Sequence, residues 1–369
     1  MEEGKLSENE INEIVRDFSI DIKATQRVAF SNQDIMPEIK VFRVVPENIQ
    51  NPLYKDINFP TDVYILHLPD IVEISCFSHL VGEELDKKCL KIGEVCAKVI
   101  QELWPFEEEN TLYYDILRAA PGYRIWEGFQ KLGKELKKIR IRPHYKIVSY
   151  RRHNPNSSQL VTLFKDYSSL PRNKELTIIK PDTEASGKTS SFAVGQLIKE
   201  ATKRKNRVKE MIITGYISAP SLDILQKLAN QYNFKIKILA WGNITALYSN
   251  NYDMPIYGLD EAAWREKGEL RKLGSIIPAE IFKDYLMYFP PGADQPGDWS
   301  ARQSFVDTGL KMEPGEIQKH LKNSLKFINN LYQLSKTQSW YKAWHEEIFQ
   351  NELKALKETL LWNNQKTLL

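Results

Sequence analysis

Short apolar runs alternate with amphipathic segments through the middle of this 369-residue chain. The runs are rich in β-branched and aromatic residues and are apolar at successive positions, a pattern typical of strands covered on both faces. We expect strands at residues 63–68, 112–119, 145–150, 176–180, 208–217 and 234–241. Apolar residues that recur at helical spacing predict helices at residues 82–103, 191–203 and 221–232. This alternation predicts an α/β fold with a parallel sheet flanked by helices.

Less regular regions lie on either side of this core. Ser7 and Glu10 have the spacing of a capping box, so residues 1–15 are expected to form a short amphipathic helix. Residues 315–362 are expected to be largely helical. We therefore predict three parts: an N-terminal extension (1–61), a central α/β domain (62–300) and a helical C-terminal appendage (301–369).

Composition and charge exclude several classes of protein. Hydrophobic residues make up 42% and charged residues 27%, which is the composition of a folded chain. The 51 basic and 48 acidic residues nearly balance, so neither nucleic acid nor a membrane is an expected partner. The three cysteines form no CxxC pair, which argues against a zinc site. The polar, acidic start does not resemble a secretory signal, and we expect a cytoplasmic protein.

The segment after the apolar run at 176–180 is the strongest candidate for chemistry. A loop that leaves a buried strand and enters a helix presents free backbone N–H groups, and the helix dipole favours an anion there. Small side chains at residues 185–187 allow a phosphate to approach the backbone. Asp182 and Glu184 are suited to the hydroxyls of a ribose or to a magnesium ion. Hydroxyl donors are present at Ser186, Thr189 and Ser190.

A nucleoside-triphosphate-binding P-loop is one alternative for this loop. Residues 187–189 read Gly-Lys-Thr, the second half of the motif GxxxxGK[ST]. The first glycine of that motif would fall at Asp182, where the tight turn needs a glycine. An ATP-dependent enzyme therefore remains an alternative based on half a motif.

Five segments, in the same order along the chain, resemble the uracil phosphoribosyltransferases. The resemblance extends over residues 62–300, and it comprises VYILHLPDIV (63–72), ILRAAPG (116–122), VSYRR (148–152), LTIIKPDTEASGKT (176–189) and PGADQPGD (291–298). In that family the corresponding segments read ILRAGLG and GMYR at the site for phosphoribosyl diphosphate (PRPP), LIVDPMLATGGS at the phosphate loop and PGLGDAGD at the uracil site. The resemblance implies a type I phosphoribosyltransferase fold.

The resemblance also implies roles for individual residues. Arg118 and Arg151 would bind the diphosphate of PRPP, with Arg151 and Asp182 at the catalytic centre, and Asp182 and Glu184 would meet the ribose hydroxyls. The loop that wraps the 5′-phosphate would consist of Thr183, Glu184, Ala185, Ser186, Gly187, Lys188 and Thr189. The base would be recognised by Gly292, Ala293, Asp294, Gly297 and Asp298.

The implied reaction is transfer of 5-phosphoribose from PRPP to a nitrogen base, uracil or a related acceptor, with release of pyrophosphate. Mg²⁺ would assist as a companion of PRPP without direct protein ligands. The expected partners are these small molecules and a second copy of the chain. Because Pro181 stands where the family has aspartate and Lys188 where it has glycine, a regulator that binds PRPP or a nucleotide without catalysis is a further alternative.

Structural roles compete with several of these assignments. Arg118 could instead pair with Asp115, and residues 291–298 could form an ordinary surface turn. Residues 257–264 are a rival candidate for the base-binding segment. Lys188 would either supply positive charge to the loop or point into water.

Overall fold

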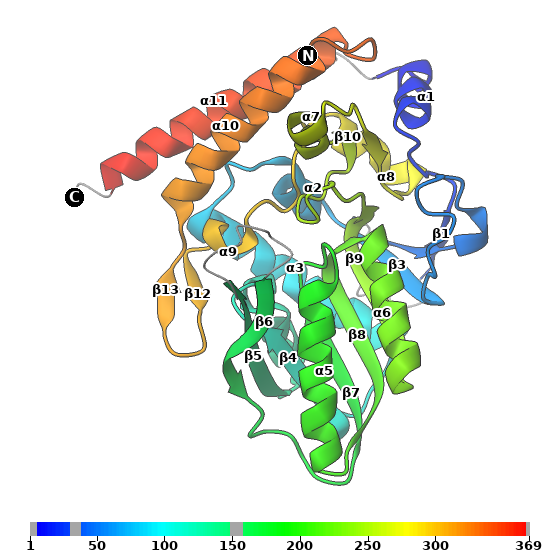
Figure 1. Ribbon diagram of the computed structural model, residues 1–369, viewed down its shortest axis with the longest axis vertical. Coiled ribbons are helices and arrows are strands. Elements are labelled where there is room, and N and C mark those ends of the chain that lie inside the picture. Colours follow the sequence, from blue (N-terminus) through cyan, green and yellow to red (C-terminus); the bar gives the residue numbers. More distant parts are fainter. Residues whose placement is uncertain (1–5, 30–37, 148–157, 367–369) are drawn as a thin grey trace.

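A nine-stranded sheet forms the centre of the molecule in the computed structural model, which describes residues 6–29, 38–147 and 158–366 (Figure 1). The strand order is β1-β2-β3-β9-β8-β7-β4-β5-β6. The strands are β1 (Thr25–Val28), β2 (Lys40–Val44), β3 (Asp62–His67), β4 (Thr111–Ile116), β5 (Lys137–Ile147), β6 (Ser158–Asp166), β7 (Glu175–Pro181), β8 (Arg207–Ser218) and β9 (Lys235–Thr245).

The sheet is mixed, whereas the sequence predicted a parallel one. The six strands that follow one another from β3 to β5 in the spatial order pair in parallel. At one edge β1 pairs antiparallel with β2 and β2 with β3, and at the other edge β6 pairs antiparallel with β5. Each of these edge strands pairs with the strand next to it in the sequence, and strands joined directly in this way pair antiparallel. The prediction of a strand at 145–150 was also inaccurate, because β5 already begins at Lys137.

Helices cover both faces of the sheet, as the alternation of strands and helices predicted. On one face lie α2 (Pro69–Cys76), α3 (Gly82–Leu103) and α4 (Ile125–Lys131), and on the other α5 (Lys188–Lys203) and α6 (Ala219–Tyr232). Neighbouring residues of one strand belong to different cores: Ile178 packs with α5 and α6, and Ile179 packs with α3. This separation follows from the alternation of side chains along a strand.

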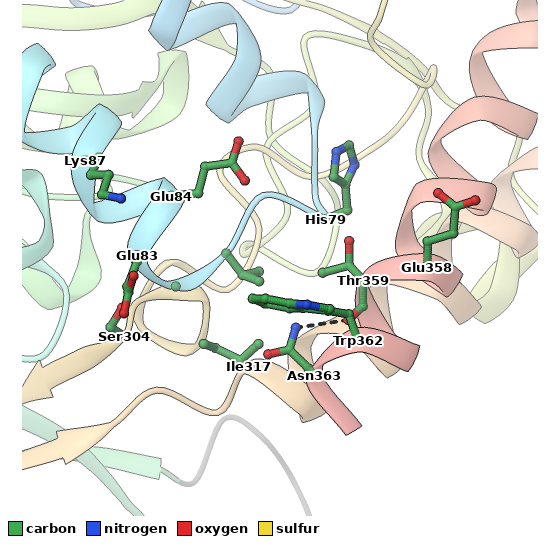
Figure 2. Close-up of a pocket in the computed structure, with 12 residues that line it drawn as sticks. His79, Glu83, Glu84, Lys87, Ser304, Ile317, Glu358, Thr359, Trp362 and Asn363 are labelled. Atoms are coloured by element: carbon green, nitrogen blue, oxygen red, sulfur yellow. Dashed lines mark hydrogen bonds between the residues drawn. The ribbon is translucent and has the colours of Figure 1, made fainter. Parts of the chain in front are cut away.

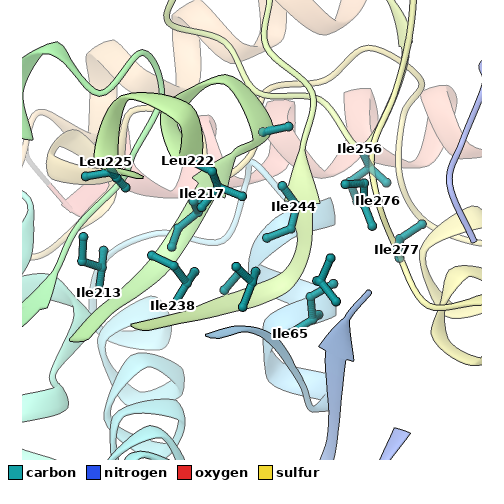
Figure 3. Packing of buried hydrophobic residues seen from close by; sticks show 14 of the residues in the cluster. Ile65, Ile213, Ile217, Leu222, Leu225, Ile238, Ile244, Ile256, Ile276 and Ile277 are labelled. Atoms are coloured by element: carbon teal, nitrogen blue, oxygen red, sulfur yellow. The ribbon is translucent and has the colours of Figure 1, made fainter. Parts of the chain in front are cut away.

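The core beneath α6 is built largely from isoleucine and leucine. Figure 3 shows Ile213 of β8 and Ile238 of β9 below Leu222 and Leu225 of α6. All four side chains are 0 or 1% exposed, so this layer is dry and closely packed. The apolar runs at 208–217 and 234–241 were read correctly because both faces of these central strands are buried.

The segments outside the sheet's main helices pack against the same body. They comprise α1 (Glu8–Asp17), η1 (Pro46–Asn48), η2 (Glu108–Asn110), η3 (Ala120–Tyr123), β10 (Tyr257–Leu259), α7 (Glu261–Lys267), β11 (Lys272–Gly274), α8 (Ala279–Leu286), α9 (Trp299–Arg302), β12 (Phe305–Asp307), β13 (Met312–Pro314), α10 (Ile317–Ser335) and α11 (Ala343–Lys366). The capping box of Ser7 and Glu10 at α1 is present as predicted. The predicted helical tail is the hairpin of α10 and α11, which lies along the outside of the body (Figure 1).

None of the helices in the described part of the chain is both long and apolar enough to span a lipid bilayer.

Candidate functional site

Four segments that are far apart in the sequence, within residues 116–119, 182–189, 252–254 and 294–300, meet around a cavity of about 200 Å³ at the carboxyl ends of β4 and β7. These two strands are parallel neighbours in the sheet. The chain leaves β4 toward α4 on one face and leaves β7 toward α5 on the other, so the following segments diverge. In open α/β sheets, ligands bind in the crevice that such a divergence creates.

The cavity contains parts of three of the five segments that the sequence singled out; residues 63–72 do not line it, and residues 148–152 lie outside the described part of the chain. Its lining residues are Ile116, Leu117, Ala119, Asp182, Thr183, Ala185, Thr189, Tyr252, Met254, Asp294, Pro296, Gly297, Asp298, Trp299 and Ser300. The segments 116–122, 176–189 and 291–298 therefore share one site. Glu184, Ser186, Gly187 and Lys188 are part of the same loop but do not line the cavity.

The first half of the loop after β7 continues the pairing of that strand with β8. The backbone N–H of Asp182 donates to the carbonyl oxygen of Thr214 (2.9 Å), and that of Glu184 donates to Tyr216 (2.8 Å). Because the backbone stays extended, residues 180, 182 and 184 place their side chains on one side.

The second half of the loop opens helix α5. Gly187 precedes the helix with φ +70°, a left-handed conformation that favours glycine, and a Cβ there would lie 3.1 Å from Ile224 of α6. No side chain caps the helix, so the N–H groups of its first turn lack the usual side-chain acceptor. Thr189 of this first turn lines the cavity. An anion in the cavity would meet these donors and the positive end of the dipole.

A buried cluster of charges lies beside the cavity, and sequence reasoning missed its cation. Lys180, the penultimate residue of β7, is fully buried and its Nζ lies 2.9 Å from Oδ2 of Asp182. The same ammonium donates to Glu184, which also accepts from the hydroxyl of Ser190. The second oxygen of Asp182 accepts from the backbone N–H of Thr183 (2.8 Å). The only signal in the sequence was a lysine within an otherwise apolar run.

Burial and charge act against each other in this cluster. Burial raises the pKa of Asp182 to about 6, with Lys180 opposing that rise and Glu184 adding to it. Burial would lower the pKa of Lys180, but the two carboxylates raise it above its ordinary value. The lysine therefore stays protonated, and its positive charge is held between two acidic side chains.

The segment 291–298 divides into a structural half and a half that faces the cavity. The N–H of Gly292 donates to Tyr257 (2.7 Å) and its carbonyl oxygen accepts from the hydroxyl of Tyr248, so its polar groups are used within the protein. Ala293 is buried and does not line the cavity. The side chains of Asp294 and Asp298 do line it, with Gly297 between them.

The two aspartates are held in place by backbone donors. Oδ1 of Asp294 accepts from the N–H of Met254 (2.7 Å), and Asp298 caps α9 by accepting from the N–H of Ala301 (3.2 Å). Burial raises the pKa of Asp294 well above its ordinary value, and the nearby carboxylate of Asp253 raises it further. This segment is mostly buried, so the alternative of an ordinary surface turn is wrong.

Two residues after this segment were not anticipated from the sequence. Trp299 lines the cavity and packs its ring 4.7 Å from that of Tyr123, measured between ring centroids. Arg302 is 1% exposed, and its guanidinium donates to the carbonyl oxygens of Ile74, Phe77, Leu80 and Pro296. One side chain thus fixes the 291–298 segment to the chain between α2 and α3.

The predicted diphosphate-binding arginines are not brought into the cavity lining. Arg118 lies between two lining residues, Leu117 and Ala119, without lining the cavity itself. It does not form the alternative ion pair either, since the cation beside Asp115 is Lys138 at 3.9 Å. Arg151 lies outside the described residues.

The structure gives less support to the two alternative assignments, which are residues 257–264 as the base-binding segment and a P-loop at residues 187–189. Residues 257–259 form β10, which pairs with β11, and Asp260 caps α7, so the 257–264 segment is used within the fold and does not line the cavity. Lys188 is exposed and lies outside the cavity lining, as expected of a side chain that points into water. A P-loop lysine would reach the phosphates, so the position of Lys188 adds no support to the ATP-dependent alternative.

Magnesium does not fit the acidic pair of the loop. Asp182 and Glu184 both accept from the ammonium of Lys180, which occupies the place between them. Among the described residues, no three or more His, Cys, Asp or Glu side chains are grouped so that they could hold a metal ion. No step of the chemistry below is therefore assigned to a cation held by these carboxylates.

A larger cavity of about 800 Å³ lies between the start of α3 and the end of α11, with Ser304, just after α9, in its lining. Figure 2 shows the ring of Trp362 reaching from α11 across this cavity toward α3. Glu83, Glu84 and Glu358 line it, with Lys87 as the basic residue among its labelled neighbours. The larger cavity contains no part of the segments 116–122, 176–189 and 291–298, so the smaller cavity is the candidate site.

No family model matches the sequence, and no curated protein matches it. Solved structures with a partial likeness include adenine phosphoribosyltransferase from Leishmania donovani, which is 14% identical at a TM-score of 0.28 over 45% of this chain and 68% of that chain. The adenine enzyme from Trypanosoma brucei is 10% identical at a TM-score of 0.31 over 51% and 86% of the two chains. Hypoxanthine-guanine phosphoribosyl transferase from L. donovani is 13% identical at 0.25 over 44% and 83%. At these values the function has to be argued from the residues of the chain itself.

Proposed function

We propose that this chain is a PRPP-dependent phosphoribosyltransferase that transfers 5-phosphoribose to a nitrogen base, uracil or a related acceptor. The observation that carries the proposal is the meeting of segments 116–122, 176–189 and 291–298 around one cavity. The sequence resemblance assigns these three of its five segments to PRPP and the base. A chance resemblance would have no reason to converge at the carboxyl edge of a parallel sheet.

The polar groups divide the cavity into subsites. The 5′-phosphate is placed at the start of α5, where the uncapped N–H groups and the hydroxyl of Thr189 are donors. Asp182 lies on the wall between this point and the 291–298 segment and accepts from the ribose hydroxyls. The base lies against Trp299, with the carboxyls of Asp294 and Asp298 available to its N–H groups.

The reaction suits a site that orients the sugar and the base and supplies no nucleophile of its own. The bond from the anomeric carbon to the diphosphate breaks, and the diphosphate leaves with the electron pair. A ring nitrogen of the base forms the new bond and gives up its proton. Asp294 accepts that proton in its carboxylate form, and burial, which raises its pKa, makes this carboxylate a stronger base. Orientation of the base and the sugar supplies the remaining rate enhancement.

Calorimetric titration with PRPP, followed by a pyrophosphate-release assay against a panel of free bases, tests the proposal. Binding and release with one base are expected. Thr189→Val should weaken PRPP binding, whereas Thr202→Val is the matched control, because Thr202 lies at the far end of the same helix and donates to Ile198. The absence of PRPP binding would overturn the proposal.

A regulator that binds PRPP or a nucleotide without catalysis is the second candidate. The observation that favours it is the ion pair of Lys180 with Asp182, because this bond occupies a carboxylate that the transferase would use at the ribose. Tight binding of PRPP with no pyrophosphate release on any base would select the regulator over the enzyme.

A further inference from the structure

The acidic pair beside the cavity, Asp182 and Glu184, already holds a cation of the protein itself, the ammonium of Lys180. Lys180, Asp182 and Glu184 alternate along one extended segment, and the backbone bonds of Asp182 and Glu184 to β8 keep that segment straight. Their side chains consequently gather on the same side. Lys180 and Glu184 are 0 and 2% exposed and Asp182 is 5% exposed, so all three are shielded from bulk water.

The ammonium of Lys180 occupies the point at which a cation would bridge the two carboxylates. It donates to Asp182 across 2.9 Å and also to Glu184. Ser190 and the backbone of Thr183 supply further donors to the same carboxylates. A divalent ion at this point would face a buried positive charge at close range and would have to displace hydrogen bonds that are already formed.

The charge of the cluster also changes what the cavity can accept. Without the lysine, two buried carboxylates would oppose the entry of a phosphorylated sugar. With it, the net charge of the three groups lies between −1 and 0, and the remaining lone pairs of Asp182 are free to accept from hydroxyl groups. The cluster thus becomes an acceptor for sugar hydroxyls instead of a cation site.

We propose that Lys180 takes the place of a divalent cation at this acidic pair, so that the ribose 5-phosphate portion of the ligand binds to the chain without magnesium. The identity of that ligand rests on the proposed function. Lys180 acts as a positioning residue, since it touches the carboxylates and not the ligand.

Calorimetric titration with ribose 5-phosphate and with uridine 5′-monophosphate tests this independence. Neither probe carries a diphosphate, so a magnesium effect would have to come from the protein. The dissociation constants with MgCl₂ and with EDTA, at equal ionic strength, should agree within about twofold. Weakening by about tenfold or more in EDTA would overturn the inference while leaving the proposed function intact. Failure of both probes and PRPP to bind in either buffer would overturn the proposed function, and the inference with it.

A second measurement needs no ligand. The melting temperature of the wild-type chain should be unchanged by MgCl₂ relative to NaCl at equal ionic strength, whereas Lys180→Met should be stabilised by Mg²⁺, because a cation then fits between the carboxylates. Lys237→Met is the matched control: Lys237 pairs with Glu210 across 2.7 Å on neighbouring strands and lies outside the cavity lining.

Lys180→Met leaves uncompensated negative charge in the interior, which opposes folding. The variant Lys180→Gln removes the positive charge, keeps an N–H donor for the carboxylates, and keeps both Asp182 and Glu184 in place. It should fold and bind uridine 5′-monophosphate more tightly with MgCl₂ than with EDTA. Equal binding in the two buffers would show that Lys180 does not substitute for a cation and would overturn the inference.

Discussion

The indole N–H of Trp299 donates a hydrogen bond to the carbonyl oxygen of Ala119 across 3.2 Å. This bond joins the first turn of α9 to the segment that follows β4, and both residues line the small cavity. Two walls of the cavity, separated by 180 residues in the sequence, are therefore held together by a single side chain. The bond links the segment after β4 to the start of α9, next to the segment that the proposed function assigns to the base.

Trp299→Phe is expected to weaken binding of the base more than it destabilises the fold. The ring contact is kept, while the loss of the hydrogen bond costs about 1 kcal/mol of unfolding free energy. The dissociation constant for the base should rise several-fold, because Ala119 is no longer held. Urea denaturation and calorimetry measure the two effects.

Trp126→Phe is the control for that variant. Trp126 makes the same kind of bond, to the carbonyl oxygen of Leu136 at 2.9 Å, and does not line the cavity. It should lose a similar amount of stability without a change in affinity. Equal losses of affinity in both variants would show that the effect is general loosening and not a property of the Trp299 bond.

Gly187→Ala is expected to abolish phosphate binding and to destabilise the chain. The φ of +70° is strained for any other residue by about 1 kcal/mol or more, and a Cβ would also press on Ile224 at 3.1 Å. Gly133→Ala has nearly the same φ of +73° but nothing within 4 Å of its Cβ. The difference between the two in thermal denaturation isolates the packing contribution, and only Gly187→Ala should weaken titration with ribose 5-phosphate.

Asp115→Asn is expected to stabilise the chain at neutral and alkaline pH. Burial raises the pKa of Asp115 to about 7 in the folded protein, from an ordinary value of 3.8, and Lys138 only partly offsets this. The folded state therefore holds a proton that the unfolded state has released. The stability that this group contributes is complete below about pH 4 and is lost as pH rises to about 7.

At about 1.4 kcal/mol per pH unit, that loss approaches about 4 kcal/mol. Urea denaturation at pH 5 and pH 8 should show a shallower decline for Asp115→Asn than for the wild type. Asp166→Asn should show no such flattening, because hydrogen bonds from Ser168 lower the pKa of Asp166. A parallel decline in the wild type and Asp115→Asn would mean that Asp115 is ionised in the folded chain.

Arg302→Met is expected to be among the most destabilising single changes. It leaves the carbonyl oxygens of Ile74, Phe77, Leu80 and Pro296 without the guanidinium that now satisfies them. A loss of about 3–5 kcal/mol in unfolding free energy is expected. Arg207→Met, which removes an exposed ion pair with Glu175, should cost about 1 kcal/mol or less. Comparable losses in the two variants would contradict the role given to Arg302.

The regular elements were predictable wherever one periodicity dominated. Helix α3 begins at Gly82 and ends at Leu103, as its apolar spacing indicated, and the central strands β7, β8 and β9 followed from uninterrupted apolar runs. Strand β6 was missed because it lies at the sheet edge, where polar and apolar side chains mix. Its antiparallel pairing made the sheet mixed.

The site was predictable only in part, because sequence patterns do not record which atoms are already bonded. The loop after β7 was found from its small residues and hydroxyl groups, and the 291–298 segment was found from its resemblance to the base-binding segment of a known family. The sequence did not reveal that Lys180 turns toward Asp182, since a lysine in an apolar run gives no direction to its side chain. Arg302 and Trp299 were missed because their partners are backbone carbonyl groups, which have no identity in a sequence.

The hydrogen bonds from Arg302 to four carbonyl oxygens affect how a ligand binds. The 291–298 segment is held to the chain between α2 and α3 before any ligand arrives, so this wall of the cavity is preorganised. Little conformational entropy remains to be lost there on association. We expect the rate of encounter, and not a rearrangement of this wall, to govern how quickly a base enters.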